Sequence, residues 1–257
     1  MKQAGMRSRD FVTPLLVLTG LGTLGAASLL LTLEESLSAI PPIQIAAAGG
    51  RTSLAAALVL QPLILVIIAS VAGLVCAPRL GLRSWIVDRL RKLEPARVPV
   101  LQSVATGAAL GIILVGIDAA FGWLADESAA ALRDARAGAG ASLLQGLLYG
   151  GITEEIIVRW GLLSIIAAGL VKVRVPFAVG IWIAIVVSSG LFSLGHLPAL
   201  AATVDLDVPL VVRTLLLNVV AGITFGTLFL RWSLESAMLA HMTVHLVFFS
   251  ATVVGVA

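Results

Sequence analysis

The sequence predicts an all-α protein: a polytopic integral membrane bundle of about seven transmembrane helices that encloses a polar cavity within the membrane. Of its 257 residues, 59% are hydrophobic and 12% are charged, whereas roughly a quarter of a soluble domain is charged. The mean hydropathy is +1.07. Apolar runs of about 20 residues, the length that crosses a bilayer, follow one another along the chain. Charged and histidine side chains inside these runs predict the cavity.

The expected spans leave no room for a separate soluble domain. The first span is longer than the apolar core of a signal peptide, about 7–15 residues, so we expect it to be uncleaved. We divide the single membrane domain into N-terminal helices with a cytoplasmic amphipathic loop, residues 1–141, and a catalytic helical core, residues 142–257. The spans lie at about 11–33, 54–77, 100–124, 142–170, 176–200, 208–230 and 234–256.

The distribution of lysine and arginine predicts the orientation. Of 17 such residues, 12 fall on the side of the N-terminus, three on the opposite side and two inside spans. The N-terminus is therefore expected in the cytoplasm and the C-terminus outside. The Ala/Gly/Val-rich, lysine-poor composition favours a bacterial inner membrane. The basic segment 78–99 is expected to meet membrane lipids as an amphipathic helix, and the charge gives no case for nucleic-acid binding.

Two adjacent glutamates lie inside the fourth expected span. A carboxylate near the middle of a bilayer costs at least about 2.5 kcal/mol, so such a residue suggests a functional site. Glu155 and Arg159 are four residues apart and share a helix face, which predicts an ion pair between them. Glu154 is then left as the free carboxylate. The alternative is that all three side chains only join helices or reach toward the membrane surface.

The three histidines of the chain, His196, His241 and His245, all lie in apolar segments after the glutamates. The spacing of His241 and His245 places both rings on one helix face, as in metalloproteases, although Met242 stands where those enzymes carry glutamate. The alternative is that these histidines are packed core residues. His196 lies about 20 residues into its span and His241 about seven into its own, so their meeting requires long or tilted helices.

A carboxylate and histidines in a water-accessible cavity can hydrolyse a bond. Glu154 would take a proton from water, and a histidine would hold that water or protonate the leaving group. Another histidine would stabilise the oxyanion. A divalent metal such as zinc is the alternative source of activated water, with His196, His241, His245 and Glu154 as candidate ligands. The sequence does not decide between these two mechanisms.

These residues resemble the signature of the CPBP family, the CAAX prenyl proteases and bacteriocin-processing membrane enzymes. The resemblance covers about residues 142–250 and rests on three ordered motifs: Glu154-Glu155-x-x-x-Arg159, Phe192-x-x-x-His196 and His241-x-x-x-His245.

The resemblance implies a role for each motif. Glu154 would activate water with His196 as its partner, and His241 would stabilise the oxyanion or orient the substrate. Glu155 and Arg159 would support the site. The chain departs from the family in carrying His245 where asparagine is commoner and Trp160 where glycine is common.

The expected function is an intramembrane endopeptidase that cleaves membrane-associated substrates. Prenylated CAAX-like proteins and bacterial peptides are the two substrate classes that the resemblance implies. The first alternative is a non-catalytic scaffold or immunity protein of the same fold. The second is a proton-coupled transporter that uses Glu154, His196 and His241 as a relay.

Overall fold

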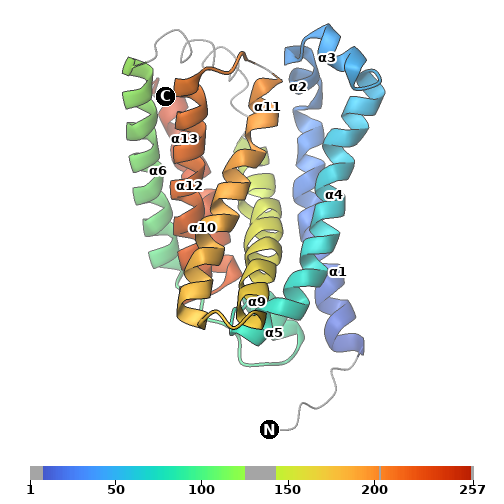
Figure 1. The fold of residues 1–257 in the computed structure, drawn as a ribbon, viewed down its shortest axis with the longest axis vertical. Coiled ribbons are helices and arrows are strands. Elements are labelled where there is room, and N and C mark those ends of the chain that lie inside the picture. The colour runs from blue at the N-terminus through green and yellow to red at the C-terminus, as the bar shows by residue number, and fades with distance from the viewer. Residues whose placement is uncertain (1–7, 125–142, 203, 256–257) are drawn as a thin grey trace.

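A computed structural model describes residues 8–124, 143–202 and 204–255, and all regular structure in these ranges is helical. The predicted all-α membrane bundle is confirmed (Figure 1). The elements in chain order are α1 (Ser8–Ser28), η1 (Leu29–Leu31), α2 (Leu33–Ala39), α3 (Pro42–Ala47), α4 (Arg51–Cys76), η2 (Ala77–Leu80), α5 (Trp85–Leu90), α6 (Val100–Leu124), η3 (Gly146–Glu154), η4 (Ile156–Leu163), α9 (Ser164–Lys172), α10 (Phe177–Gly195), α11 (Leu197–Ala201), α12 (Val208–Arg231) and α13 (Leu234–Val253).

Within the described ranges, six helices are long and apolar enough to cross a membrane. They correspond to six of the seven expected spans. The remaining one, residues 142–170, forms a run of shorter segments, η3, η4 and α9, and carries the charged residues. The segments η3 and η4 have π-helical hydrogen bonding. Such wider turns are rare and are frequent at functional sites.

Polar residues in the sequence mark where two of the long helices begin. The carboxylate of Asp207 accepts a hydrogen bond from the backbone N–H of Leu210 at 2.8 Å and caps α12. The hydroxyl of Ser233 accepts one from the N–H of Ser236 at 3.3 Å and caps α13. Because the first N–H groups of a helix lack partners within the helix, these caps fix the chain reversals on either side of α12.

The charged helical run lies inside the bundle. The helices α1 and α4 pack on one side of η3 and η4, while α13 packs on η3 and α10 and α12 pack on η4. The side chains of Trp160, Phe225 and Phe229 are buried at the centre. Large apolar side chains such as Leu16 and Ile112 are more than 60% exposed, as expected of a surface that faces lipid.

The bundle has two distinct ends. The first described residues, α5 and the α9–α10 connection lie at one end, and the end of α13 lies at the other (Figure 1). Between the ends, Arg213 of α12 pairs with Asp118 of α6. This pairing accounts for two charged residues inside predicted spans, because a charge is tolerated there when it meets an opposite charge.

Candidate active site

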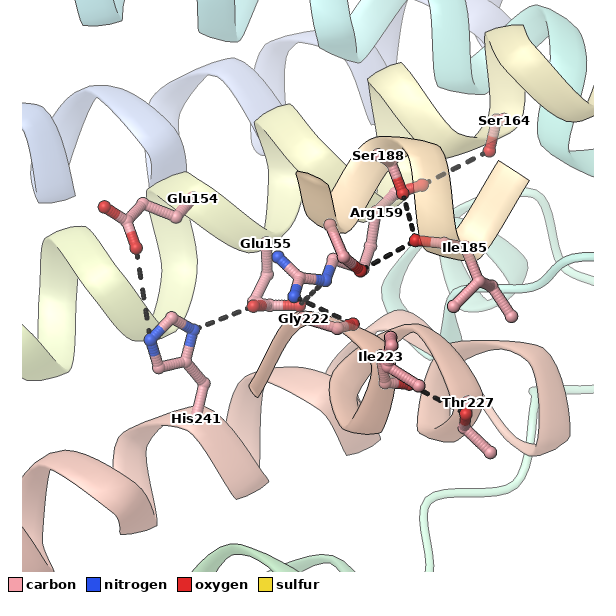
Figure 2. Close-up of polar contacts among 11 residues, drawn as sticks. Glu154, Glu155, Arg159, Ser164, Ile185, Ser188, Gly222, Ile223, Thr227 and His241 are labelled. Carbon is pink, nitrogen blue, oxygen red and sulfur yellow. Dashed lines mark hydrogen bonds and ion pairs between the residues drawn. The ribbon is translucent and has the colours of Figure 1, made fainter. Parts of the chain in front are cut away.

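The structure contains the predicted ion pair between Glu155 and Arg159. The Nε atom of Arg159 lies 3.2 Å from Oε2 of Glu155, and the two side chains are 1% and 0% exposed (Figure 2). Removing two charges from water is costly, and their mutual attraction offsets this cost only partly. Glu155 directly follows the last residue of η3, so the pair sits where the two π-helical segments meet.

The guanidinium of Arg159 is held by neighbours from two other helices. Its Nη2 donates a hydrogen bond to the carbonyl of Gly222 in α12 at 3.2 Å. Its Cζ lies 5.3 Å from the ring centroid of Phe192 in α10 and 5.4 Å from that of Phe225 in α12. A desolvated cation over an aromatic face gains about 2 kcal/mol. Arg159 therefore connects η4 to α10 and α12.

One histidine lies between the two glutamates. The Nδ1 atom of His241 lies 2.8 Å from Oε1 of Glu155, and its Nε2 atom lies 4.0 Å from Oε2 of Glu154 (Figure 2). Because the carboxylate of Glu155 accepts, Nδ1 carries the hydrogen of this bond, and Nε2 is the ring nitrogen that faces Glu154. The side chain of Glu154 is 16% exposed, whereas that of Glu155 is fully buried.

Aromatic stacking fixes the plane of the His241 ring. The ring of Phe225 stacks on it with centroids 4.5 Å apart, and the ring of His245 stacks on it with centroids 5.0 Å apart. With Nδ1 bonded to Glu155 as well, the ring has little rotational freedom. His245 itself is partly buried, and its ring lies edge-on to that of Phe248.

Two glycines in η3 allow α13 to approach the glutamates. A Cβ atom at Gly146 would lie 2.6 Å from Nδ1 of His245, and one at Gly150 would overlap Nε2 of the same ring. Real Cβ atoms essentially never approach so closely. Glycine at these positions therefore permits the contact between His245 and η3.

The N-terminal helix reaches the residue before Glu154. The hydroxyl of Thr153 donates a hydrogen bond to the carbonyl of Gly22 in α1 at 2.8 Å, and Thr153 is fully buried. A Cβ atom at Gly25 would overlap this hydroxyl, so glycine allows the close approach of α1. The hydroxyl of Thr32 also bonds to Oε1 of Gln145 at 2.9 Å. The N-terminal helix α1 and the segment that follows it therefore contact the run of helix that carries Glu154.

His196 lies at the end of α10 as its C-cap residue. Its Nδ1 lies 2.9 Å from the carbonyl of Phe192 and donates to it, since a carbonyl only accepts. Its ring packs edge-on against Phe192. Among the described residues, the histidine within 4.0 Å of Glu154 is His241. The pairing of Glu154 with His196 thus stays a prediction.

The candidate metal ligands do not form a metal site. Within residues 8–124, 143–202 and 204–255, no three His, Cys, Asp or Glu side chains are gathered closely enough to hold a metal ion. The arrangement of the ligand candidates therefore gives no support to zinc.

Residues 137–247 match the family described as type II CAAX prenyl endopeptidase Rce1-like. This match supports a CPBP-family intramembrane protease. The match confirms the resemblance that the three motifs indicated. No curated protein and no solved structure matches the chain.

The matched region, residues 137–247, contains every predicted site residue, and α1 to α6 lie outside it. Two contacts at the site were not predicted from the sequence: the hydrogen bond of Glu155 to His241 and that of Thr153 to Gly22. The first joins residues 86 apart and the second joins residues 131 apart. The spacing Gly146-x-x-x-Gly150 was a sequence signal for close helix approach and could have indicated the docking of α13.

Proposed function

We propose that the chain is a membrane-embedded endopeptidase that uses Glu154 to activate water and does not require a metal. The observation that carries the proposal is the position of His241 between the two glutamates. The membership of residues 137–247 in an Rce1-like family supports peptide-bond cleavage as the reaction class. Both the roles of the residues and the substrate are proposals.

The gap between Glu154 and His241 suits one water molecule. Oε2 of Glu154 and Nε2 of His241 are both acceptors and lie 4.0 Å apart. A water at hydrogen-bond distance of about 2.8 Å from each would subtend an angle of about 90°, which is close to its own H–O–H angle. Both of its hydrogens would then be engaged by these acceptors, leaving an oxygen lone pair for the substrate carbonyl.

The reaction then proceeds by addition and elimination. As the water oxygen bonds to the carbonyl carbon, Glu154 takes one of its protons as general base. When the C–N bond breaks, the protonated Glu154 returns this proton to the leaving nitrogen, which gives a carboxylic acid and an amine. The acid then transfers its remaining proton to the amine, and the final products are a carboxylate and an ammonium. Glu155 holds His241 in the tautomer that accepts at Nε2, a role similar to that of the carboxylate in hydrolase triads.

The preferred substrate in this proposal is a peptide bond close to a membrane anchor, of the CAAX-like kind that the family description names. Bacterial peptides are the other substrate class to test. The site lies within a bundle whose described surface is rich in exposed apolar side chains, which suits a substrate that is itself bound to the membrane.

The test uses the full chain in liposomes with two sets of anchored peptides, one with a prenylated C-terminal CAAX-like sequence and one with an unprenylated apolar leader. Mass spectrometry of the products identifies cleavage. We expect wild type to cleave at least one set, and Glu154→Gln to lower the rate by at least 100-fold, since general base catalysis contributes about 10²–10⁴-fold.

The matched control is Glu35→Gln, which removes an exposed carboxylate from α2, a helix outside the candidate site. It should cleave at the wild-type rate. Full activity of Glu154→Gln would contradict the assignment of the base. No cleavage of either set by folded wild type, together with flux driven by a pH gradient, would favour the transporter alternative.

A further inference from the structure

We propose that one end of the bundle is a binding surface for the phosphate-bearing headgroups of anionic phospholipids. Four separate segments bring their cations to this end: the start of α1, residues 77–99, the α9–α10 connection and the α12–α13 connection (Figure 1). The exposed cations here are Arg9, Arg79, Arg83, Arg89, Lys92, Arg97, Lys172, Arg174 and Arg231. This inference does not depend on the proposed proteolysis.

Hydrogen bonds and helix packing hold the four segments together as one surface. The N–H of Leu234, at the start of α13, donates to the carbonyl of Arg83 at 3.1 Å. The Nε of Arg91 donates to the carbonyl of Asp10 in α1 at 2.9 Å. The segment η2 packs against α9. The cations are therefore presented by a fixed scaffold at this end.

Two of the acidic groups at this end, Glu235 and Asp88, are used inside the scaffold. Glu235 accepts hydrogen bonds from the N–H groups of Trp85 and Ile86 at 2.8 and 3.1 Å and caps the start of α5. Asp88 is buried, pairs with Arg83 at 2.8 Å and accepts from the N–H of Ala96 at 3.0 Å. These carboxylates are turned toward backbone donors and Arg83, so they do little to neutralise the remaining cations.

Among the described residues, the opposite end carries mainly acidic side chains. Its described residues there include Glu34, Glu35, Asp205 and Asp207, and Arg51 is paired with Glu34. The cations are therefore concentrated on one end. An excess of lysine and arginine also sets membrane orientation, but orientation alone does not require the cations to be arranged on one rigid surface.

The surface carries side chains suited to the level of lipid headgroups. Trp85 is 40% exposed, and the guanidinium of Arg89 lies 5.3 Å from its ring centroid. Arg231 lies 5.9 Å from the ring centroid of Trp232, and Leu93 is 55% exposed beside Lys92. Tryptophan is enriched at membrane interfaces, and an apolar side chain among cations favours a lipid over free phosphate.

The test is native mass spectrometry of the purified full chain titrated with phosphatidylglycerol or phosphatidylcholine. We expect wild type to bind phosphatidylglycerol more tightly and to lose this preference as salt is raised. Each cation near an anionic surface contributes about fivefold in affinity. The variant Arg89→Gln/Lys92→Gln/Arg97→Gln should therefore bind phosphatidylglycerol about 100-fold more weakly at low salt.

Two controls isolate the surface. Arg51→Gln removes a cation from the opposite end and should bind like wild type, and Arg89→Lys/Arg97→Lys should keep the preference because the charge is kept. Inorganic phosphate at millimolar concentration should not displace the lipid. Equal binding of the two lipids by wild type, an unchanged triple variant, or displacement by inorganic phosphate would each overturn the proposal. If the triple variant does not fold, the salt titration of wild type decides.

Discussion

The Nδ1 atom of His241 lies 2.8 Å from Oε1 of Glu155, although the two residues are 86 positions apart. This contact gives Glu155 two partners, since its other oxygen lies 3.2 Å from Nε of Arg159. It also leaves the Nε2 atom of His241 facing Glu154. The adjacent glutamates thus contact the same histidine from two sides, one buried and bonded and the other partly exposed.

Phe225 is expected to support the site through its aromatic ring as well as its volume, because the ring stacks on that of His241 and lies near the guanidinium of Arg159. Phe225→Leu keeps most of the apolar bulk and removes both ring contacts. Stacking and cation–π contacts contribute about 0.5–2 kcal/mol each. We predict a decrease in cleavage rate of about tenfold, measured with the anchored peptide. Phe229→Leu, one turn along α12 and packed on Trp160, is the control and should lose stability with little loss of rate.

Gly150→Ala is predicted to displace α13 from the glutamates. The added Cβ would overlap the His245 ring, and overpacking of this kind costs about 1–3 kcal/mol. Cleavage should fall and the thermal unfolding temperature should decrease. Gly169→Ala lies in the same helical run with no atom within 4 Å of the new Cβ. Gly169→Ala should leave stability unchanged or raise it. If Gly150→Ala also leaves the cleavage rate and the unfolding temperature unchanged, the close contact between Gly150 and His245 is contradicted.

Thr153→Val tests whether α1 positions η3, the segment that carries Glu154. The change keeps the shape of the side chain and removes the hydrogen bond to the carbonyl of Gly22. We expect a loss of about 1 kcal/mol in the free energy of unfolding and a lower cleavage rate, because Glu154 is the next residue. Thr224→Val removes a hydroxyl that bonds only within its own helix, to Val220. It should leave the rate unchanged; equal effects of the two variants would argue against a role for α1.

His245→Asn tests metal dependence. If His245 packs against η3 and binds no metal, asparagine should retain at least about a third of the wild-type cleavage rate. Elemental analysis of purified wild type should find no stoichiometric zinc, and a chelator should not lower the rate. Zinc at one per chain that is lost in His245→Asn would establish this residue as a ligand and contradict the proposed mechanism.

The sequence predicted what depends on local spacing and composition. Six apolar runs became six long helices, and residues four apart, Glu155 and Arg159, formed an ion pair as helix geometry requires. The contacts between helices were not predicted, because periodicity within one helix does not specify its rotation against another. The fourth run illustrates this: its apolar length predicted an ordinary span, whereas the structure has two π-helical segments that meet at the glutamates.

The most direct test of the account compares Glu154→Gln with Glu155→Gln by cleavage of the anchored peptide and by thermal unfolding in the same membrane mimic. Glu154→Gln should abolish cleavage and leave the unfolding temperature near that of wild type, because its side chain is partly exposed and has no short hydrogen bond among the described residues. Glu155→Gln should lower both, since breaking a buried ion pair costs about 3–5 kcal/mol. If Glu155→Gln unfolds like wild type, or if Glu154→Gln still cleaves, the division of roles between the two glutamates is wrong.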